Sequence, residues 1–301
     1  MNDFAKGAAW MDGEIMPIHE AKIGVTDWGF TRSDATYDVV TVWDGAFFRL
    51  DDHVDRFMES LRKCHLTIPL GPDEIKQILN DIVAASELQA AYCAFVTTRG
   101  IQTVPGSRDP RTCLNRFFAW VVPYVNVIAD DVAARGTRLK IADTVERINQ
   151  AAVDPTAKNY HWGDLTKGLF EALEAGFDTV VLKDSTGNIT EGPGFNIFAV
   201  IDGVVVTPKD GVLEGITRKT VLEICASLNI PAEIRAVSVA EFLAAEEVFL
   251  SSSGGGAVPI VQVDAHILGN GVTGPITERI CETYANWRAA GPLRTAVTYS
   301  P

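Results

Sequence analysis

The segment DPTAKNYHWGD at residues 154–164 is the most informative part of the sequence. It places one lysine between a proline-containing turn and an expected helix. Aromatic and amide side chains flank this lysine, Lys158. A lysine that is partly desolvated in such a place can lose its proton and attack an aldehyde as a nucleophile. Taken alone, the same pattern also fits a surface lysine near the start of a helix.

A glutamate followed by two glycines and an apolar run, NITEGPGFNIF at residues 188–198, is the second informative segment. Glycines allow the backbone to approach a ligand closely. Glu191 can then pair with a pyridinium nitrogen and keep an electron-accepting ring protonated. An exposed glutamate in a turn is the alternative interpretation of this segment.

Two further segments have the features of an anion site. LEGITRK at residues 213–219 opens an expected helix after a glycine, where free backbone N–H groups attract phosphate. Thr217 fits the role of a helix N-cap equally well. SSSGGG at residues 251–256 adds hydroxyls and amides that can bind the same anion, although most glycine-rich loops are simple turns.

Strand and helix patterns alternate without the regular order of a doubly wound sheet, so the sequence predicts an α+β fold. Asp44-Gly45 separates two β-rich runs and predicts a hairpin. Gly100–Pro110 is rich in Gly, Pro and Ser and is expected to be a loop with a functional role. Helices are expected over residues 52–64, 161–175, 217–228 and 275–287 and from residue 72, and strands over 37–43, 47–50, 92–98, 116–125, 179–182, 195–201, 204–207 and 248–251.

The chain has 301 residues, which exceeds the size at which one hydrophobic core usually stops growing. We expect an N-terminal domain at residues 1–126, an interdomain loop at 127–136 and a C-terminal domain at 137–301. The loop is placed there because Asp130, Asp131 and Gly136 interrupt the apolar periodicity.

Composition excludes several classes of protein. The net charge of −13 disfavours binding to nucleic acid or to anionic membranes. No apolar stretch is long enough to cross a bilayer, and the first residues lack the apolar core of a secretory signal, so a cytoplasmic location is expected. The five cysteines and five histidines are scattered, so we expect free thiols and no metal site.

These segments occur together and in order, and they follow LDDHVDR at residues 50–56, which contains Arg56. As a set they resemble the fold-type IV pyridoxal-phosphate aminotransferases, the superfamily of branched-chain and D-amino-acid aminotransferases. The resemblance extends from about Gly7 to about Trp287. It implies a two-domain fold with a smaller N-terminal α/β lobe, a larger C-terminal lobe with a β-barrel-like core, and pyridoxal 5′-phosphate at the lobe interface.

The resemblance also implies roles for individual residues. Lys158 would form the Schiff base with the cofactor and move the proton during catalysis, and Glu191 would hold the pyridine nitrogen. A homodimer with shared active sites is implied, in which Arg32 and the segment 100–108 reach the site of the partner. The residues that match the phosphate grip are Arg56, Ile216, Thr217 and Ser253.

Within the superfamily, the motifs most resemble those of the (R)-selective amine transaminases. FAKG at residues 4–7, SDATYDV at 33–39 and KNYHWGDL at 158–165 carry this likeness. Two positions depart from it: Pro105 stands where that group has an arginine for the substrate carboxylate, and Ala94 stands where it has an acidic residue. The substrate-binding residues expected from the resemblance are Tyr37, Arg32, Tyr92, Arg108, Trp162 and Gly254.

The expected function is therefore a transaminase that moves an amino group from an (R)-amine or amino acid to a small 2-keto acid by a ping-pong mechanism. The alternatives are a D-amino-acid or branched-chain aminotransferase and, less favoured by the Lys158–Trp162 motif, an aminodeoxychorismate lyase. A vitamin B6 carrier is the alternative from another class, but a carrier has no need for a pyridinium partner such as Glu191.

Overall fold

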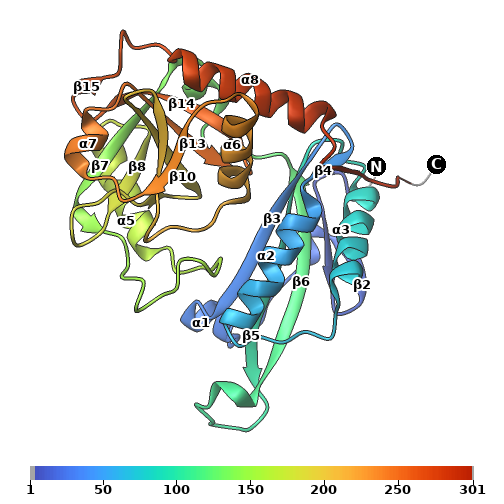
Figure 1. Cartoon of the computed structure of the whole chain (residues 1–301). Helices are drawn as coiled ribbons and strands as arrows, with labels where there is room; N and C mark the ends of the chain where they lie inside the picture. Colours follow the sequence, from blue (N-terminus) through green and yellow to red (C-terminus); the bar gives the residue numbers. More distant parts are fainter. Residues whose placement is uncertain (1–3, 300–301) are drawn as a thin grey trace. The chain divides into compact units, whose positions relative to one another are not determined.

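The computed structural model describes residues 4–299, which divide by their contacts into two compact units. The first unit comprises Met1–Val125, Ala157–Tyr160 and Arg288–Pro301, and the second comprises Asn126–Thr156 and His161–Trp287. Each unit is built on its own β-sheet (Figure 1). The combination of an antiparallel sheet, a mixed sheet and interspersed helices confirms the α+β class.

The sheet of the first unit has seven strands that pair antiparallel throughout. Its central strands, β3 and β5, are long. Nearly all of their residues are buried, on both faces of the sheet. In spatial order the strands are β16 (Arg294–Ala296), β4 (Ala46–Phe48), β3 (Ala35–Trp43), β5 (Ala91–Gln102), β6 (Cys113–Pro123), β1 (Ala8–Met11) and β2 (Glu14–Pro17).

Two helices, α2 (Leu50–Lys63) and α3 (Pro72–Ser86), cover one face of this sheet (Figure 1). On α2 the buried residues Leu50, Val54, Phe57 and Leu61 recur at the three- and four-residue spacing of a helix face. Phe57 packs edge-on against Phe95 of β5, with 4.9 Å between ring centroids. This layer forms the core of the unit, and the short helix α1 (Trp28–Arg32) lies outside it.

The predicted hairpin at Asp44-Gly45 is confirmed. Trp43 of β3 pairs with Ala46 of β4, and the two residues between them have φ angles of 49° and 65°. Two successive left-handed residues form the turn type that matches the twist of a hairpin, and glycine accepts this conformation without steric cost.

The sheet of the second unit is mixed, because the pairs β11–β12, β14–β7 and β7–β8 are parallel while the remaining pairs are antiparallel. The main path of strands is β12 (Ala232–Arg235), β11 (Val204–Pro208), β10 (Phe195–Ile201), β13 (Glu247–Ser252), β14 (Gly256–Val263), β7 (Thr137–Glu146) and β8 (Thr179–Lys183). Two-residue strands β9 (Glu191–Gly192) and β15 (His266–Ile267) pair with β10 and β14.

The helices of the second unit are α4 (Asp130–Arg135), α5 (Gly163–Glu174), α6 (Ile216–Ser227), α7 (Val239–Leu243) and α8 (Pro275–Ala290), the last of which ends in residues grouped with the first unit. Helix α5 packs on β7 and β8 through Leu165 and Ala172. Helix α6 contacts β12, β13 and β14. Helices α5 and α6, which precede β8 and β12 in the chain, therefore pack against the sheet.

The division into units differs from the expected boundaries at 126 and 137. Residues 157–160 group with the first unit because Asn159 forms a β-bridge with Thr36. The chain after Arg288 also groups there, since β16 pairs with β4. The segment 127–136 is not a connecting loop but contains α4 and belongs to the second unit.

The expected loop at 100–110 begins later than predicted. Strand β5 continues to Gln102 through an irregularity between Thr98 and Ile101, and Ile101 pairs with Leu114 of β6. A bulge of this kind lets a strand pass a glycine without losing its partner. In the part of the chain that the structure describes, no helix combines the length and apolar character needed to cross a membrane.

Candidate active site

The backbone of Lys158 is fastened to the first unit by three hydrogen bonds. Its carbonyl oxygen accepts from the backbone N–H of Tyr37 at 3.1 Å and from the hydroxyl of Thr36 at 2.6 Å. Its own N–H donates to the hydroxyl of Ser60 on α2 at 3.2 Å. These bonds hold the segment around Lys158 against β3 and α2. The backbone position of the lysine, from which its side chain extends, is therefore fixed.

An aromatic ring lies beside the lysine side chain. The Nζ atom lies 4.6 Å from the ring centroid of Tyr37, a distance at which a cation is attracted to the ring face. Tyr37 in turn stacks on Tyr160, with 4.1 Å between centroids and an angle of 5° between planes. Burial raises the pKa of Tyr160 above its usual range, so its phenol stays neutral. Lys158 therefore has an apolar flank built from neutral rings.

A second group in the first unit joins β3 to α2 through Asp38, whose side chain is completely buried. Arg56 donates two hydrogen bonds to its carboxylate, from Nε to Oδ2 and from Nη2 to Oδ1, each at 2.8 Å. Nδ1 of His53 lies 2.8 Å from Oδ1 of the same carboxylate. His53 and Arg56 are three residues apart on α2 and so face the same strand.

The protonation of this group follows from its surroundings. Burial alone would raise the pKa of Asp38, but the charge of Arg56 and the hydrogen bonds from His53 and Arg56 hold it well below its usual value. Burial lowers the pKa of His53 in spite of its bond to Asp38, so its ring is neutral near neutral pH. Because an ionised carboxylate only accepts, Nδ1 of His53 is the nitrogen that carries the proton.

In the second unit, Glu191 is buried at the start of the β9–β10 hairpin, where it pairs with Asn196 in register. Arg147 donates to its Oε1 from Nη2 at 2.9 Å and from Nε at 3.3 Å. The backbone N–H of Leu213 donates to Oε2 at 2.9 Å, and the amide of Asn196 lies 3.4 Å from the same oxygen. Both oxygens of the carboxylate are hydrogen-bonded, so its orientation is fixed. A group that binds a ligand in one orientation needs to be fixed in this way.

The start of α6 has the features of an anion site. Its N-cap residue, Gly215, provides no side-chain cap, and the first two helical residues, Ile216 and Thr217, are buried. A Cβ atom at Gly215 would lie 2.1 Å from Oδ1 of Asn196, so glycine is required by this packing. The turn that contains Ser253 is fastened nearby in the same unit, since Gly254 accepts a hydrogen bond from the N–H of Val127 at 2.7 Å.

The six expected substrate residues lie in different places. Tyr37 and Tyr92 belong to neighbouring strands of the first unit, on the face away from α2 and α3. Arg32 ends α1 and stacks on Trp28 with 3.3 Å from its Cζ atom to the ring centroid. Arg108 lies in the loop after β5. The last two residues, Trp162 and Gly254, lie in the second unit.

The structure brings the predicted site residues together in two sets. The first unit holds Arg56 and Lys158 with Tyr37, and the second holds Glu191 with Ile216, Thr217 and Ser253. Four charged or polar partners were not expected from the sequence: Asp38, Arg147, Asp164 and Asn196. Only Asp38 had a usable signal, a carboxylate inside the otherwise uncharged strand pattern of residues 35–43.

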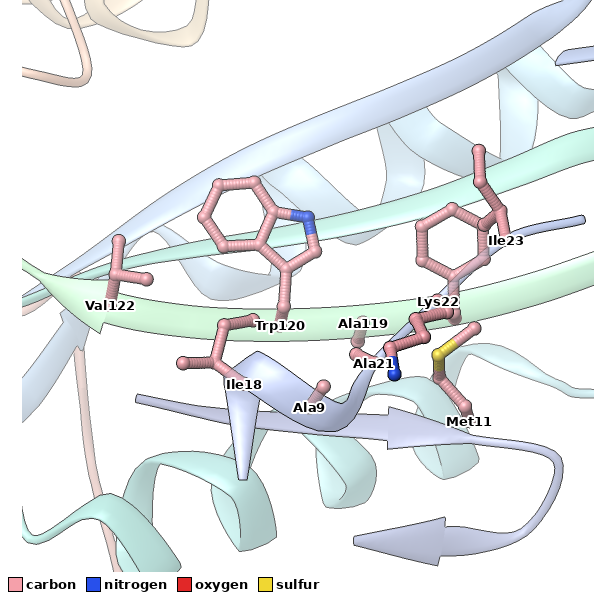
Figure 2. Close-up of a pocket in the computed structure, with 10 residues that line it drawn as sticks. Ala9, Met11, Ile18, Ala21, Lys22, Ile23, Ala119, Trp120 and Val122 are labelled. Atoms are coloured by element: carbon pink, nitrogen blue, oxygen red, sulfur yellow. The ribbon is translucent and has the colours of Figure 1, made fainter. Parts of the chain in front are cut away.

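An apolar cavity of about 350 Å³ lies on the face of the first sheet that bears Tyr37 and Tyr92. Figure 2 shows Trp120 and Val122 of β6 beside Ile18, with Met11 of β1 and Ile23 at the other end. The cavity is thus on the side of the sheet opposite to α2 and α3. Among residues 4–299 no group of three or more His, Cys, Asp or Glu side chains is placed to hold a metal ion.

Comparison with known protein families gives a match over most of the chain. The family model described as amino-transferase class IV matches residues 35–263. A putative branched-chain-amino-acid aminotransferase of Methanocaldococcus jannaschii is 27% identical over 282 residues, which cover 93% of this chain and 96% of the relative. A D-alanine aminotransferase of Bacillus licheniformis is 24% identical over 274 residues, which cover 89% of this chain and 93% of the relative.

Solved structures give the same result for the fold. The branched-chain aminotransferase of Thermoproteus uzoniensis with norvaline has a TM-score of 0.88 at 27% identity, and the match covers 97% of this chain and 99% of that structure. The branched-chain amino acid aminotransferase of Thermobaculum terrenum in its PLP form has a TM-score of 0.84 at 24% identity, and the match covers 97% of this chain and 98% of that structure.

Proposed function

The chain belongs to the class IV aminotransferases and is a pyridoxal 5′-phosphate-dependent aminotransferase, and from this premise we propose that it transfers an amino group from an (R)-amine or amino acid to a small 2-keto acid. The observation that carries the substrate proposal is an aromatic cluster beside Lys158: Tyr37 lies 4.6 Å from its Nζ atom, and Tyr160 and Tyr92 pack with Tyr37. An apolar wall of this kind accepts a donor without a carboxylate more readily than a strongly cationic pocket would.

The residues of the two sets fit the chemical groups of the cofactor. An aldehyde needs an amine, which Lys158 supplies. A pyridinium nitrogen needs a carboxylate, which Glu191 supplies in a fixed orientation. A phosphate needs a guanidinium and backbone N–H groups, which Arg56 and the uncapped start of α6 supply. Each group of pyridoxal phosphate therefore has a complementary side chain or helix end in this chain.

When bound, the cofactor accepts the amino group of the donor, withdraws electrons from the carbon that loses a proton, and passes the amino group to the keto acid in a second half-reaction. We assign the proton transfer to Nζ of Lys158, because its backbone is fixed by three hydrogen bonds and the neutral Tyr37 ring flanks its amine.

Glu191 has the role of holding a proton on the ring nitrogen. Its carboxylate is paired with Arg147 and hydrogen-bonded by the N–H of Leu213, so its orientation toward a ring nitrogen would be fixed before the cofactor binds. Preorganisation of this kind saves the free energy that rearranging a dipole would cost during the reaction.

Arg56, Ile216, Thr217 and Ser253 are proposed to bind the phosphate. Asp38 fixes Nε and Nη2 of Arg56, which determines the plane in which the guanidinium meets a phosphate oxygen. The start of α6 adds its helix dipole. These groups would hold the phosphate of the cofactor independently of Lys158.

We propose that the enzyme acts as a homodimer with shared active sites and works in the cytoplasm. Large apolar side chains are exposed in and near α1 and at the β5–β6 connection, namely Val25, Phe30, Ile101, Val104 and Leu114, of which Ile101 and Leu114 are paired across the strands. Contiguous exposed apolar surface marks a site of protein association. The five cysteines are free thiols, which fits a reducing compartment.

A D-amino-acid or branched-chain aminotransferase is the second candidate, favoured by the names of the relatives. The test is absorption spectroscopy of the protein loaded with pyridoxal phosphate. The visible band should fall on addition of (R)-1-phenylethylamine, stay with the (S)-amine and return with pyruvate. A response to D-alanine or L-leucine but to neither phenylethylamine would establish the second candidate, and a band that no amine changes would refute both.

A further inference from the structure

Three charged side chains of the second unit form a continuous row from Asp164 through Arg147 to Glu191. Nη1 of Arg147 donates to Oδ2 of Asp164 at 2.6 Å, and Nη2 donates to Oε1 of Glu191 at 2.9 Å. All three side chains are largely buried, with exposed fractions of 12%, 7% and 9%. One guanidinium therefore serves two carboxylates that are both shielded from water.

Asp164 and Arg147 are both fixed by backbone hydrogen bonds. The N–H groups of Ile148 and Leu165 donate to the two oxygens of Asp164 at 2.7 and 2.8 Å. The N–H of Arg147 itself donates to the carbonyl of Lys183 at 2.8 Å. Asp164 lies in the first turn of α5, where the helix dipole stabilises a negative charge. The row is a built structure rather than a chance contact between mobile surface groups.

A second cation in the same unit interacts with Glu191. Arg218 of α6 is buried and interacts electrostatically with Glu191 and Glu214, but its hydrogen bonds go to the hydroxyl of Thr207 and the carbonyl of Pro208. Burial lowers the pKa of Arg218, whereas Glu191 and Asp164 overcome the effect of burial and raise the pKa of Arg147. Arg147 is thus a cation that is hydrogen-bonded directly to Glu191.

We propose that Asp164 and Arg147 are positioning residues that set how strongly the pyridine nitrogen of the cofactor holds its proton. The inference rests on the proposed function, because it takes Glu191 as the group that meets this nitrogen. Arg147 fixes one carboxylate oxygen of Glu191 and draws on its negative charge. Asp164 also pairs with the guanidinium of Arg147 and neutralises part of its positive charge. More of the negative charge of Glu191 is then available to stabilise the proton on the ring nitrogen. That proton exchanges with bulk water.

The two residues have opposite expected effects on the nitrogen. Removing the charge of Asp164 leaves the surroundings one unit more positive, and a nearby positive charge disfavours a protonated nitrogen. Removing the charge of Arg147 leaves the surroundings one unit more negative and favours the proton. A purely structural role would disturb the nitrogen in the same way in both variants, so the direction of the shift separates the two explanations.

The experiment uses the full chain loaded with pyridoxal phosphate that carries ¹⁵N at the ring nitrogen, whose chemical shift reports protonation directly. The pH of half-protonation should fall by at least about one unit in Asp164→Asn and in Asp164→Ser. It should rise in Arg147→Gln. The matched control is Asp143→Asn, an exposed carboxylate of the same unit that pairs with Lys140, and it should match the parent protein.

Half-reaction kinetics give a second measurement. Asp164→Asn should lower the rate of the donor half-reaction with little change in the concentration of donor at half-saturation, because donor binding does not involve Asp164. If Asp164→Asn and Asp164→Ser keep the nitrogen signal of the parent, the inference is overturned while the proposed function stands. If the nitrogen is unprotonated in the parent protein itself, the role of Glu191 in the proposed function fails and the inference fails with it.

Discussion

Arg56 and Asp38 meet through two parallel hydrogen bonds of 2.8 Å, so that a guanidinium on α2 lies in the plane of a completely buried carboxylate on β3. The pair joins a helix to the strand on which Lys158 is anchored through the carbonyl of its backbone. The geometry of the proposed phosphate grip and the placement of the proposed catalytic lysine therefore depend on the same strand.

Asp38→Asn should destabilise the first unit and weaken cofactor binding. The asparagine leaves the buried charge of Arg56 without its anion, and removing one partner of a buried ion pair costs about 3–5 kcal/mol. Urea unfolding measures this cost. The matched control is Asp51→Asn in the first turn of α2, since Asp51 is exposed and pairs with Lys76 at the surface. An equal, small effect of both substitutions would show that the Asp38–Arg56 pair contributes little.

His53 should make the free energy of unfolding depend on pH below its ordinary pKa of 6.5. Its folded-state pKa is lowered, so the unfolded chain binds the proton first and stability falls as pH decreases below about 6.5. One such proton gives a slope of at most about 1.4 kcal/mol per pH unit. His53→Asn should remove this slope. The control is His19→Asn, because His19 is exposed and its replacement should leave the slope unchanged.

Asp38 adds to the same trend at lower pH. Its pKa is lowered in the folded state, so its contribution to stability is complete above the ordinary value of 3.8 and is lost as pH falls through the folded-state value. The two slopes are separable because they begin near different pH values. A protein whose stability was constant from about pH 7 to about pH 5 would contradict the buried, neutral state of His53.

The sequence predicted much of the fold because its signals are local. Strand β10 was predicted with the bounds it has, 195–201, and helix α8 was expected to start at Pro275, where it does. A run of apolar and β-branched residues or a proline at the first helical turn determines such elements without help from distant residues. Strands β1, β2, β12 and β16 are four residues or shorter, and their pairing is determined by partners far along the chain.

The site could be predicted only where a motif carried it. Lys158, Glu191 and Arg56 lie in recognisable segments. The residues next to them in the sequence form the motifs from which their roles were predicted. Arg147 follows a strand with no local sign of a ligand, yet it binds carboxylates at positions 164 and 191. A contact of this kind depends on how α5 and β9 meet in the folded unit, which no spacing rule within one segment describes.

Lys158→Ala should reduce transamination by more than about 10³-fold, because general acid–base catalysis alone contributes about 10²–10⁴-fold. The fold should persist, since the anchoring bonds of residue 158 are made by its backbone. Borohydride reduction of the loaded parent protein, followed by peptide mass spectrometry, should find the cofactor on Lys158. The control Lys167→Ala changes an exposed lysine of α5 and should keep full activity. A label on another lysine would refute the assignment.

Gly215→Ala should weaken cofactor binding by disturbing Asn196. The added Cβ atom would lie 2.1 Å from Oδ1 of Asn196, whose amide donates to the carbonyl of Leu213 at 2.8 Å. Overpacking of this kind costs about 1–3 kcal/mol. Gly163→Ala is the matched control, because a Cβ atom at that helix start meets nothing within 4 Å. Titration with pyridoxal phosphate compares the two, and equal affinities would mean that Asn196 moves without consequence.

The last prediction concerns the group that binds the keto-acid carboxylate, since Pro105 stands where the (R)-selective amine transaminases, which the motifs resemble, have an arginine. Arg32 and Arg108 are the candidates, and in the described part of the chain neither makes an ion pair. Arg32 is the better placed, because its guanidinium is stacked on Trp28, and the indole of Trp28 donates to Gln102 at 3.1 Å. A stacked guanidinium keeps its N–H edge available for a carboxylate.

Arg32→Ala should raise KM for pyruvate by well over an order of magnitude, because losing a desolvated charge pair costs about 2–5 kcal/mol. The half-reaction with a carboxylate-free (R)-amine should change far less, since that donor has no anion for Arg32 to bind. Stopped-flow absorbance measures the two half-reactions separately. Equal losses in both would assign Arg32 to the dimer interface or to the packing of α1, and a selective loss in Arg108→Ala alone would give the role to the loop arginine.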